Sequence, residues 1–315
     1  MSNDNGEKPD GEFDNITRLY IRTHPADVGS RPLPGGLPFW LSPDITIIRP
    51  GGIRGSEGKV GESDQVEVVV TNIGGIDAVD AYVEAFLADP STAFTPATAT
   101  PVGSGFLTIP NHNLAPITFP WIPTVTDAGH RCMLARVCLS VPYDCYANPA
   151  IFDVQNDRHL AQRNLNVLSF KQETLSFAFL VVNPLQDKGA FVLRTVEVNV
   201  GRNADLVRGA LGTKFAQFGQ AKLGGIGLTL GELVHPAQEP GAAPKYPTGV
   251  LREKMEVPRV KTVRLELGRD ERRYAVLTVA RNSAIRQGDL NVVQVKQIDA
   301  RTERTVGGLW LIVQH

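Results

Sequence analysis

Three cysteines and six histidines are the residues of this chain whose chemistry most often marks a catalytic or metal site. The cysteines are Cys132, Cys138 and Cys145. An odd number of cysteines with no Cys-x-x-Cys pair favours neither a zinc site nor a disulfide framework. The spacing would allow a bridge between Cys138 and Cys145 but does not itself indicate one. We therefore expect thiols that are half-exposed on the face of a strand.

The histidines show no metal-binding pattern. They are His24, His112, His130, His159, His235 and His315. No HxH or HExxH arrangement occurs, and none pairs with the cysteines in the spacing of a transition-metal site. His130 and Cys132 are expected to face the same way on one strand, but Cys–His catalysis would also need an orienting group and an oxyanion hole. The sequence indicates neither, so we interpret the two as a surface pair.

A group of acidic and amide side chains could hold a calcium ion through oxygen ligands. Its members are Asp144, Asp153, Asn156 and Asp157. They lack the regular spacing of a dedicated calcium loop, so turn-forming Asp and Asn residues are the favoured interpretation. Calcium binding in the Asp144/Asp153/Asp157 region is the alternative.

A glycine-rich run extends from Gly219 to Gly231 (GQAKLGGIGLTLG). It does not match the phosphate-binding pattern GxxxxGK[ST], and no strand followed by a helix frames it. We interpret it as an interdomain loop, with an apolar connection that docks on a partner as the alternative. No GxSxG motif or cofactor fingerprint occurs elsewhere. The sequence thus assigns no catalytic residue, no cofactor and no metal ligand, and we expect no enzymatic activity.

The overall charge of −1 hides an asymmetry between the two halves of the chain. Residues 1–170 hold 11 Lys+Arg and 19 Asp+Glu, about −8, whereas residues 171–315 hold 21 and 14, about +7. Such an asymmetry can favour head-to-tail association or an intramolecular interface, and neutral drift of two surfaces explains it equally well. The arginines of the basic half are interleaved along strands without clustered stacking aromatics, so we expect no nucleic-acid binding.

A chain of 315 residues suits two domains, each with its own core. In the segment Asp64–Leu87, two strand-like runs flank an Asn-Ile-Gly-Gly-Ile-Asp turn, which predicts a strand, a tight connection and a second strand. Trp121 is expected to pack on this pair. In the strand 130–139 the less apolar face, with Cys132, Arg136 and Cys138, is expected to point outward.

The first half of the chain resembles the CARDB-type immunoglobulin-like module of bacteria, a β-sandwich. The resemblance covers about residues 40–170. The residues that carry it are Trp40-Leu41-Ser42-Pro43-Asp44-Ile45, Val70-Thr71-Asn72-Ile73-Gly74, Trp121-x-Pro123, Gly129-His130-Arg131-Cys132, and Asn156-Asp157-x-x-x-Ala161-Gln162-x-Asn164-Leu165. Members of this family are mostly exported and serve as spacers or binding modules, so the resemblance implies a fold more than a specific function.

The second half predicts another β-rich domain, over residues 171–315. Val192–Val200 alternates apolar and polar residues, which indicates a half-buried antiparallel strand. Loose helical spacing over Ala204–Phe218 indicates one amphipathic helix. The predicted fold class is therefore all-β: two immunoglobulin-like β-sandwich domains in tandem, the second with a short helical and glycine-rich insertion at about 203–250. Trp310 is expected in its core.

The amino-terminal part, residues 1–38, is predicted to be a flexible arm followed by a Pro/Gly linker. Within it, the apolar–polar alternation of Ile16–Ile21 could pair as an edge strand instead. The first domain is then expected at 39–170. The first 15 residues are polar and acidic with no apolar core of a Sec signal peptide, and no run approaches the length of a membrane span. We expect cytoplasmic synthesis, with Sec-independent export left open.

From these features we predict a non-catalytic structural or protein–protein interaction component, part of a larger bacterial assembly, with a protein partner or self-association. The expected contact surfaces are exposed strand edges, the amino-terminal arm and Gly219–Gly231. The alternative is a ligand- or carbohydrate-binding accessory module of an exported system.

Overall fold

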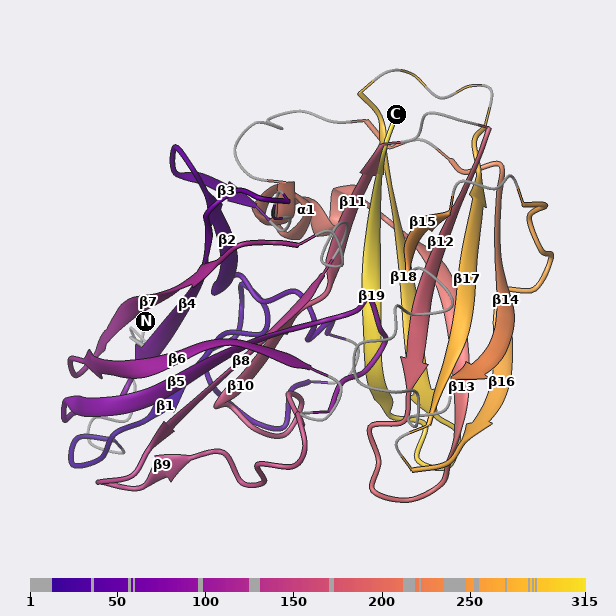
Figure 1. Ribbon diagram of the computed structural model, residues 1–315. Coiled ribbons are helices and arrows are strands. Elements are labelled where there is room, and N and C mark those ends of the chain that lie inside the picture. Colours follow the sequence, from indigo (N-terminus) through magenta and orange to yellow (C-terminus); the bar gives the residue numbers. More distant parts are fainter. Residues whose placement is uncertain are drawn as a thin grey trace, which may run out of the picture.

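The computed structural model shows two β-sandwiches that share an apolar junction (Figure 1). It describes residues 13–315 except 35–36, 56–57, 59, 96–98, 125–130, 170–172, 212–218, 221, 235–247, 252–254, 270, 283, 285 and 287. The prediction of an all-β protein built from tandem β-sandwiches is confirmed. The helix predicted over 204–218 is present as α1 (Ala204–Leu211), and residues 212–218 of that prediction lie outside the described residues.

The first sandwich faces one sheet of five strands against another. The strands of the first sheet are β1 (Leu19–Tyr20), β2 (Ile45–Arg49), β3 (Ile53–Gly55), β4 (Asp64–Asn72) and β7 (Asn113–Trp121). Strand β4 is central: it pairs with β2 and β1 on one side and with β7 on the other. Its Val66, Val68 and Val70 are fully buried, as the alternating pattern requires.

The opposing sheet of the first sandwich carries the candidate functional site. Its strands are β5 (Ala78–Ala88), β6 (Thr100–Ile109), β8 (Cys132–Leu139), β9 (Asp144–Cys145) and β10 (Leu160–Arg163). The order is β10-β8-β5-β6, and β9 pairs with β8 on the same side as β10. The two sheets together have the strand arrangement of an immunoglobulin-like sandwich. Trp121 pairs with Asp64 and packs against the core, as predicted.

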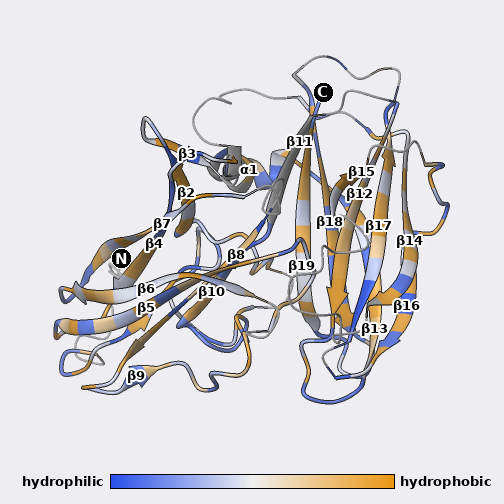
Figure 2. Cartoon of the chain, in the orientation of Figure 1, coloured by the Kyte–Doolittle hydropathy of each residue, from blue (hydrophilic) through white to orange (hydrophobic). Residues whose placement is uncertain are grey.

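The second sandwich has sheets of five and four strands, in the orders β11-β19-β18-β13-β16 and β14-β17-β12-β15. Figure 2 shows hydrophobic residues running along its strands. The bounds are β11 (Leu165–Ser169), β12 (Thr174–Val182), β13 (Gly189–Val198), β14 (Gly225–Val234), β15 (Gly249–Leu251), β16 (Thr262–Leu267), β17 (Arg272–Ala280), β18 (Leu290–Asp299) and β19 (Thr305–Gln314). Its core includes the fully buried Phe179, Phe191 and Leu193.

A third apolar cluster lies where the two sandwiches meet. Phe39, Trp40, Phe86 and Leu134 reach it from the first half of the chain, and Val207, Val292, Trp310 and Ile312 reach it from the second. The Trp40 ring lies so close to Gly308 that a Cβ there would stand 2.7 Å from two ring atoms. Trp310 is buried as predicted, but it lies with Trp40 in the junction rather than in the centre of either sandwich.

Asn164 is the polar counterpart of this cluster. Its side-chain N–H groups donate to the carbonyls of Ser91 (2.5 Å) and Gly308 (2.7 Å), and its Oδ1 accepts from the Cys132 thiol (2.7 Å). Its backbone N–H donates to the carbonyl of Trp40. A fully buried side chain thus joins segments from both sandwiches.

Three predictions about segments are wrong. The flexible arm expected at the amino terminus is wrong where the chain is described, and the alternative of an edge strand within Ile16–Ile21 holds: β1 pairs with β4, and Leu19 and Ile21 are fully buried in the first core. The strand after Asn164 was assigned to the first domain, but β11 pairs in parallel with β19 of the second. The glycine-rich run was interpreted as a loop, yet its second half is strand β14, paired with β17. Residues 1–12 lie outside the described residues.

Replacing Asn164 should destabilise both sandwiches together. In Asn164→Ala the buried carbonyls of Ser91 and Gly308 lose their donor, which should lower the free energy of unfolding by about 2–4 kcal/mol. The shared cluster also predicts one cooperative transition, monitored by tryptophan fluorescence and circular dichroism in urea. Asn148→Ala, at an exposed turn, is the control and should change stability by less than about 0.5 kcal/mol. Two separate transitions in the unmodified protein would contradict the shared junction.

Candidate functional site

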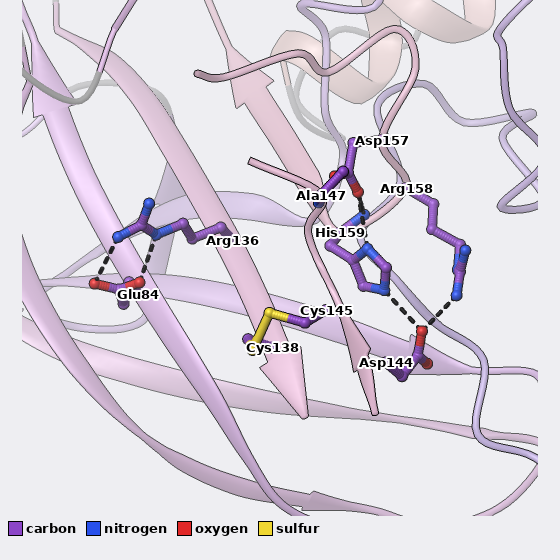
Figure 3. Close-up of a disulfide and its surroundings, with 9 residues drawn as sticks. All are labelled: Glu84, Arg136, Cys138, Asp144, Cys145, Ala147, Asp157, Arg158 and His159. Atoms are coloured by element: carbon purple, nitrogen blue, oxygen red, sulfur yellow. Dashed lines mark hydrogen bonds and ion pairs between the residues drawn. A yellow bond between two sulfur atoms is a disulfide. The ribbon is translucent and has the colours of Figure 1, made fainter. Parts of the chain in front are cut away.

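A hairpin closed by a disulfide stands at one edge of the β10-β8-β5-β6 sheet. Cys138 of β8 and Cys145 of β9 face each other in the ladder and form a bond with an S–S distance of 2.06 Å (Figure 3). The turn between them exposes two apolar side chains: Val141 is 83% and Tyr143 is 77% solvent-accessible. The hairpin therefore combines a covalently closed base with an apolar tip.

This disulfide corrects the expectation of free, half-exposed thiols. Sequence spacing could not show that the register of β8 and β9 places Cys138 opposite Cys145. The third cysteine, Cys132, is fully buried rather than half-exposed. Cys132 lies on the same face of the sheet as Arg136, and the junction cluster covers the part of this face around Cys132. Burial raises the pKa of the Cys132 thiol far above its ordinary value.

Asp144 anchors the base of the hairpin next to Cys145. Its carboxylate accepts the backbone N–H of Leu19 (2.6 Å), lies 2.8 Å from Nε2 of His159 and pairs with the Arg158 guanidinium (Figure 3). These partners come from segments far apart in the chain. The interaction ties β1, the hairpin and the start of β10 to one another.

His159 is held on its other side by a second carboxylate. Its Nδ1 lies 2.8 Å from Oδ1 of Asp157, and the backbone N–H of Ala147 donates to the other Asp157 oxygen at 2.7 Å. The His159 side chain is 5% exposed. The sequence groups Asp144 with Asp157 as oxygen ligands for calcium in one interpretation, but nothing in the spacing indicates that both would bind the His159 ring.

The protonation of the cluster follows from its geometry. Burial alone would lower the pKa of His159, but hydrogen bonds to Asp144 and Asp157 outweigh it and hold the pKa above 6.5. Burial would likewise raise the pKa of both carboxyl groups, but the His159 ring and backbone donors hold each below 3.8. Below pH 6.5 the ring is therefore an imidazolium whose two N–H groups both donate to carboxylates. Neither nitrogen remains open to take a proton from a substrate.

The calcium interpretation finds no support in the geometry of these acids. Asp144 and Asp157 use their oxygens for His159 and for backbone donors. Both Asp153 oxygens accept from the Asn156 side-chain amide at 2.9 Å. Across the described residues, no three His, Cys, Asp or Glu side chains lie together as a metal site would require. The acids close turns and pair with internal donors instead.

An arginine surrounded by aromatic rings continues the surface beside the hairpin. Arg136 pairs with Glu84 on the neighbouring strand and lies 4.7 Å from the ring centroid of Tyr146. Further along the same sheet, Tyr82 pairs in register with Cys138 and contacts Phe106, with ring centroids 5.3 Å apart. The outer face of the sheet is therefore an aromatic and charged surface that runs from the hairpin to β6.

Not all of the histidines considered from the sequence are described. His130 and His235 fall outside the described residues, so the predicted His130–Cys132 pair is not described. His315 contacts Asn291 at the end of the second sandwich, and the His24 ring accepts the backbone N–H of Ala26. None of these contacts brings a histidine beside a free cysteine.

Comparisons with known proteins place this chain in no family. No family model and no curated protein matches the chain. Among solved structures, the CARDB domain of the PF1109 protein from Pyrococcus furiosus is 18% identical and covers 38% of this chain and 88% of its own, with a TM-score of 0.25. The collagen adhesin of S. aureus is 8% identical over 89% of this chain and 96% of its own, with a TM-score of 0.23.

Within the described residues, no helix is both long and apolar enough to span a membrane.

The buried cluster predicts how stability depends on pH. The carboxyl pKa values are lowered on folding, so their contribution is complete above about pH 3.8 and is lost as pH falls through the lowered values. The pKa of His159 is raised, so its contribution is complete below about pH 6.5 and is lost as pH rises through the raised value. Urea unfolding should show a plateau between these limits, and His159→Gln should remove the decline on the alkaline side.

Asp144→Asn should cost about 3 kcal/mol at pH 5.5, because the buried His159 ring then keeps only Asp157 as a charge partner and the half-buried Arg158 guanidinium loses Asp144. The same urea measurement tests this. Asp153→Asn is the matched control. The Asp153 side chain is exposed and accepts hydrogen bonds from the Asn156 side-chain amide. This substitution should lower the free energy of unfolding by less than about 0.5 kcal/mol. Equal effects of the two variants would contradict the assigned role of Asp144.

Proposed function

We propose that this protein is a non-catalytic structural or protein–protein interaction component of a larger bacterial assembly, and that the disulfide-closed hairpin is a contact surface. One observation carries the proposal: the base of the hairpin is fixed by the disulfide and by Asp144, while Val141 and Tyr143 at its tip are exposed. Binding residues lie disproportionately on loops that a rigid scaffold holds in place.

The rigidity of the hairpin supports this assignment on energetic grounds. Ordering a loop and its side chains on binding costs about 0.5–1.5 kcal/mol for each side chain that is immobilised. A loop that is already held by a covalent bond and a buried ion cluster avoids much of that cost. Tyrosine is also among the residues that contribute most to interfaces, because its ring buries a large area with few rotatable bonds.

The surroundings of His159 and Cys132 support a role without catalysis. Both nitrogens of His159 are engaged by carboxylates, and Cys132 is buried with a raised pKa. A general base needs an open lone pair, and a cysteine nucleophile needs an accessible thiolate. Neither group meets its requirement.

The disulfide also supports a setting outside the reducing cytosol. Structural disulfides persist mainly in oxidising compartments and on exported proteins. We therefore propose that the protein is exported after synthesis, by a route that the sequence does not define.

A ligand- or carbohydrate-binding accessory module is the second candidate. The observation that favours it is the outer face of the sheet, where the exposed Phe106 contacts Tyr82 beside the Arg136–Glu84 pair. Aromatic faces next to charged hydrogen-bonding groups can hold a small polar ligand. Binding to a glycan array that is lost in Tyr82→Ala but kept in Val141→Ser/Tyr143→Ser would favour this function over the first.

The hairpin assignment predicts that Val141→Ser/Tyr143→Ser loses a partner while its fold is unchanged. Crosslinking in the native host followed by quantitative mass spectrometry should recover a protein with the unmodified chain that is depleted at least about tenfold with the variant, because the interface loses two apolar anchors. Purified partner and chain should then show the same difference by calorimetry. Val260→Ser, equally apolar and 50% exposed in the second half of the chain, is the control. Recovery that does not distinguish the two variants would refute the assignment.

A further inference from the structure

A long stretch of the first half of the chain carries no charged residue. From position 90 through position 126 there is no Asp, Glu, Lys or Arg, although 21% of the chain is charged. The stretch includes β6 and β7, and each of these is the last strand at one edge of its sheet. The two strands also lie in contact, since a Cβ added at Gly103 of β6 would stand 2.7 Å from the Phe119 ring of β7. One side of the first sandwich is therefore formed by two uncharged edge strands.

Exposed edges are usually protected against pairing by charges, prolines, short length or a covering segment. The other edges of this molecule show such protection. Strand β16 carries Arg264 and Glu266, and β14 is covered where the Leu228 N–H donates to the carbonyl of Val260 at 2.7 Å. Strands β3, β9, β10, β11 and β15 have at most five residues each.

Strand β6 differs from all of these edges. It is 10 residues long, and in the described part of the chain it pairs with β5 alone. Strand β7 contains Pro116 and Pro120, each of which removes a backbone N–H donor. The part of β6 from Gly103 to Ile109 has no proline. Every second residue of an antiparallel edge strand points its N–H and C=O away from the sheet. Phe106 on the outer face is 68% exposed.

We propose that β6 pairs antiparallel with β6 of a second copy of this chain across a two-fold axis, which joins two sheets into one. A two-fold axis places each strand against an identical one, so any charge near its centre would face a like charge. The absence of charge from the whole strand removes that repulsion. A strand selected to pair with a different protein would gain register and specificity from charges, and β6 has none.

The two-fold arrangement also covers the apolar residue that the monomer leaves exposed. With the axis perpendicular to the joined sheet, the outer faces of the two copies are continuous. The Phe106–Tyr82 contact of each copy then extends across the new pairing. This surface lies at the opposite edge of the sheet from the disulfide-closed hairpin, so the pairing goes beyond the proposed function and does not depend on it.

Sedimentation equilibrium of the full chain tests the pairing. The unmodified protein should be a dimer at micromolar concentration, and Ser104→Lys/Phe106→Lys should raise the dimer dissociation constant roughly tenfold or more. Circular dichroism and thermal unfolding confirm that the variant is folded. Val260→Lys is the control and should remain dimeric. A monomeric unmodified protein up to about 100 μM, or a dimer that the double lysine variant leaves intact, would overturn the proposal.

Single cysteines locate the axis. Cys132 is buried and the other two cysteines are paired, so a new thiol at an exposed position of β6 is the accessible one. Among Ser104→Cys, Phe106→Cys and Thr108→Cys, the variant nearest the axis should form a covalent dimer on mild oxidation, and Val260→Cys should not. Crosslinking at Val260 alone would overturn β6 pairing. Val141→Ser/Tyr143→Ser should keep the dimer, so failure of the hairpin assignment and failure of the pairing give different results.

Discussion

The carboxylate of Asp144 is the interaction on which the best-defined surface of this protein depends. It lies beside the disulfide and binds the backbone of β1, the guanidinium of Arg158 and the ring of His159. A buried carboxylate is costly unless several donors compensate it, and here an imidazolium, a guanidinium and a backbone N–H do so. The disulfide limits how far the two strands of the hairpin can separate, whereas Asp144 fixes where the hairpin stands on the sandwich.

At the junction between the sandwiches, buried polar groups are also compensated by hydrogen bonds, but these groups are neutral. Asn164 satisfies two carbonyls that neither sandwich could satisfy alone, and the Thr92 hydroxyl contacts the Gln297 amide nearby. These hydrogen bonds do not use the opposite charges of the two halves. Neutral polar groups surrounded by apolar rings bring the halves together without the desolvation cost of buried ions.

The sequence allowed prediction of the elements that depend on local alternation, and it failed where distant segments meet. The strand pair Asp64–Leu87 and the helix at Ala204 follow from spacing alone. The burial of Leu19, the partner of β11 and the Cys138–Cys145 bond depend instead on which strands become neighbours. His159 is the clearest case. Its role comes from two carboxylates on either side, and sequence spacing alone does not indicate that both would face one ring.

The two proposed surfaces have a geometric consequence when they are considered together. They lie at opposite edges of one sheet, in the order β9 and β10, β8, β5, β6. Pairing of β6 with its copy would therefore place the two hairpins at the two outer ends of the joined sheet, facing away from the axis. A partner with repeated binding sites could then be held at two points, and linked contacts bind far more tightly than either one when the spacing matches. A weak hairpin contact would be sufficient for a component of a repeating assembly, because the dimer supplies the second contact.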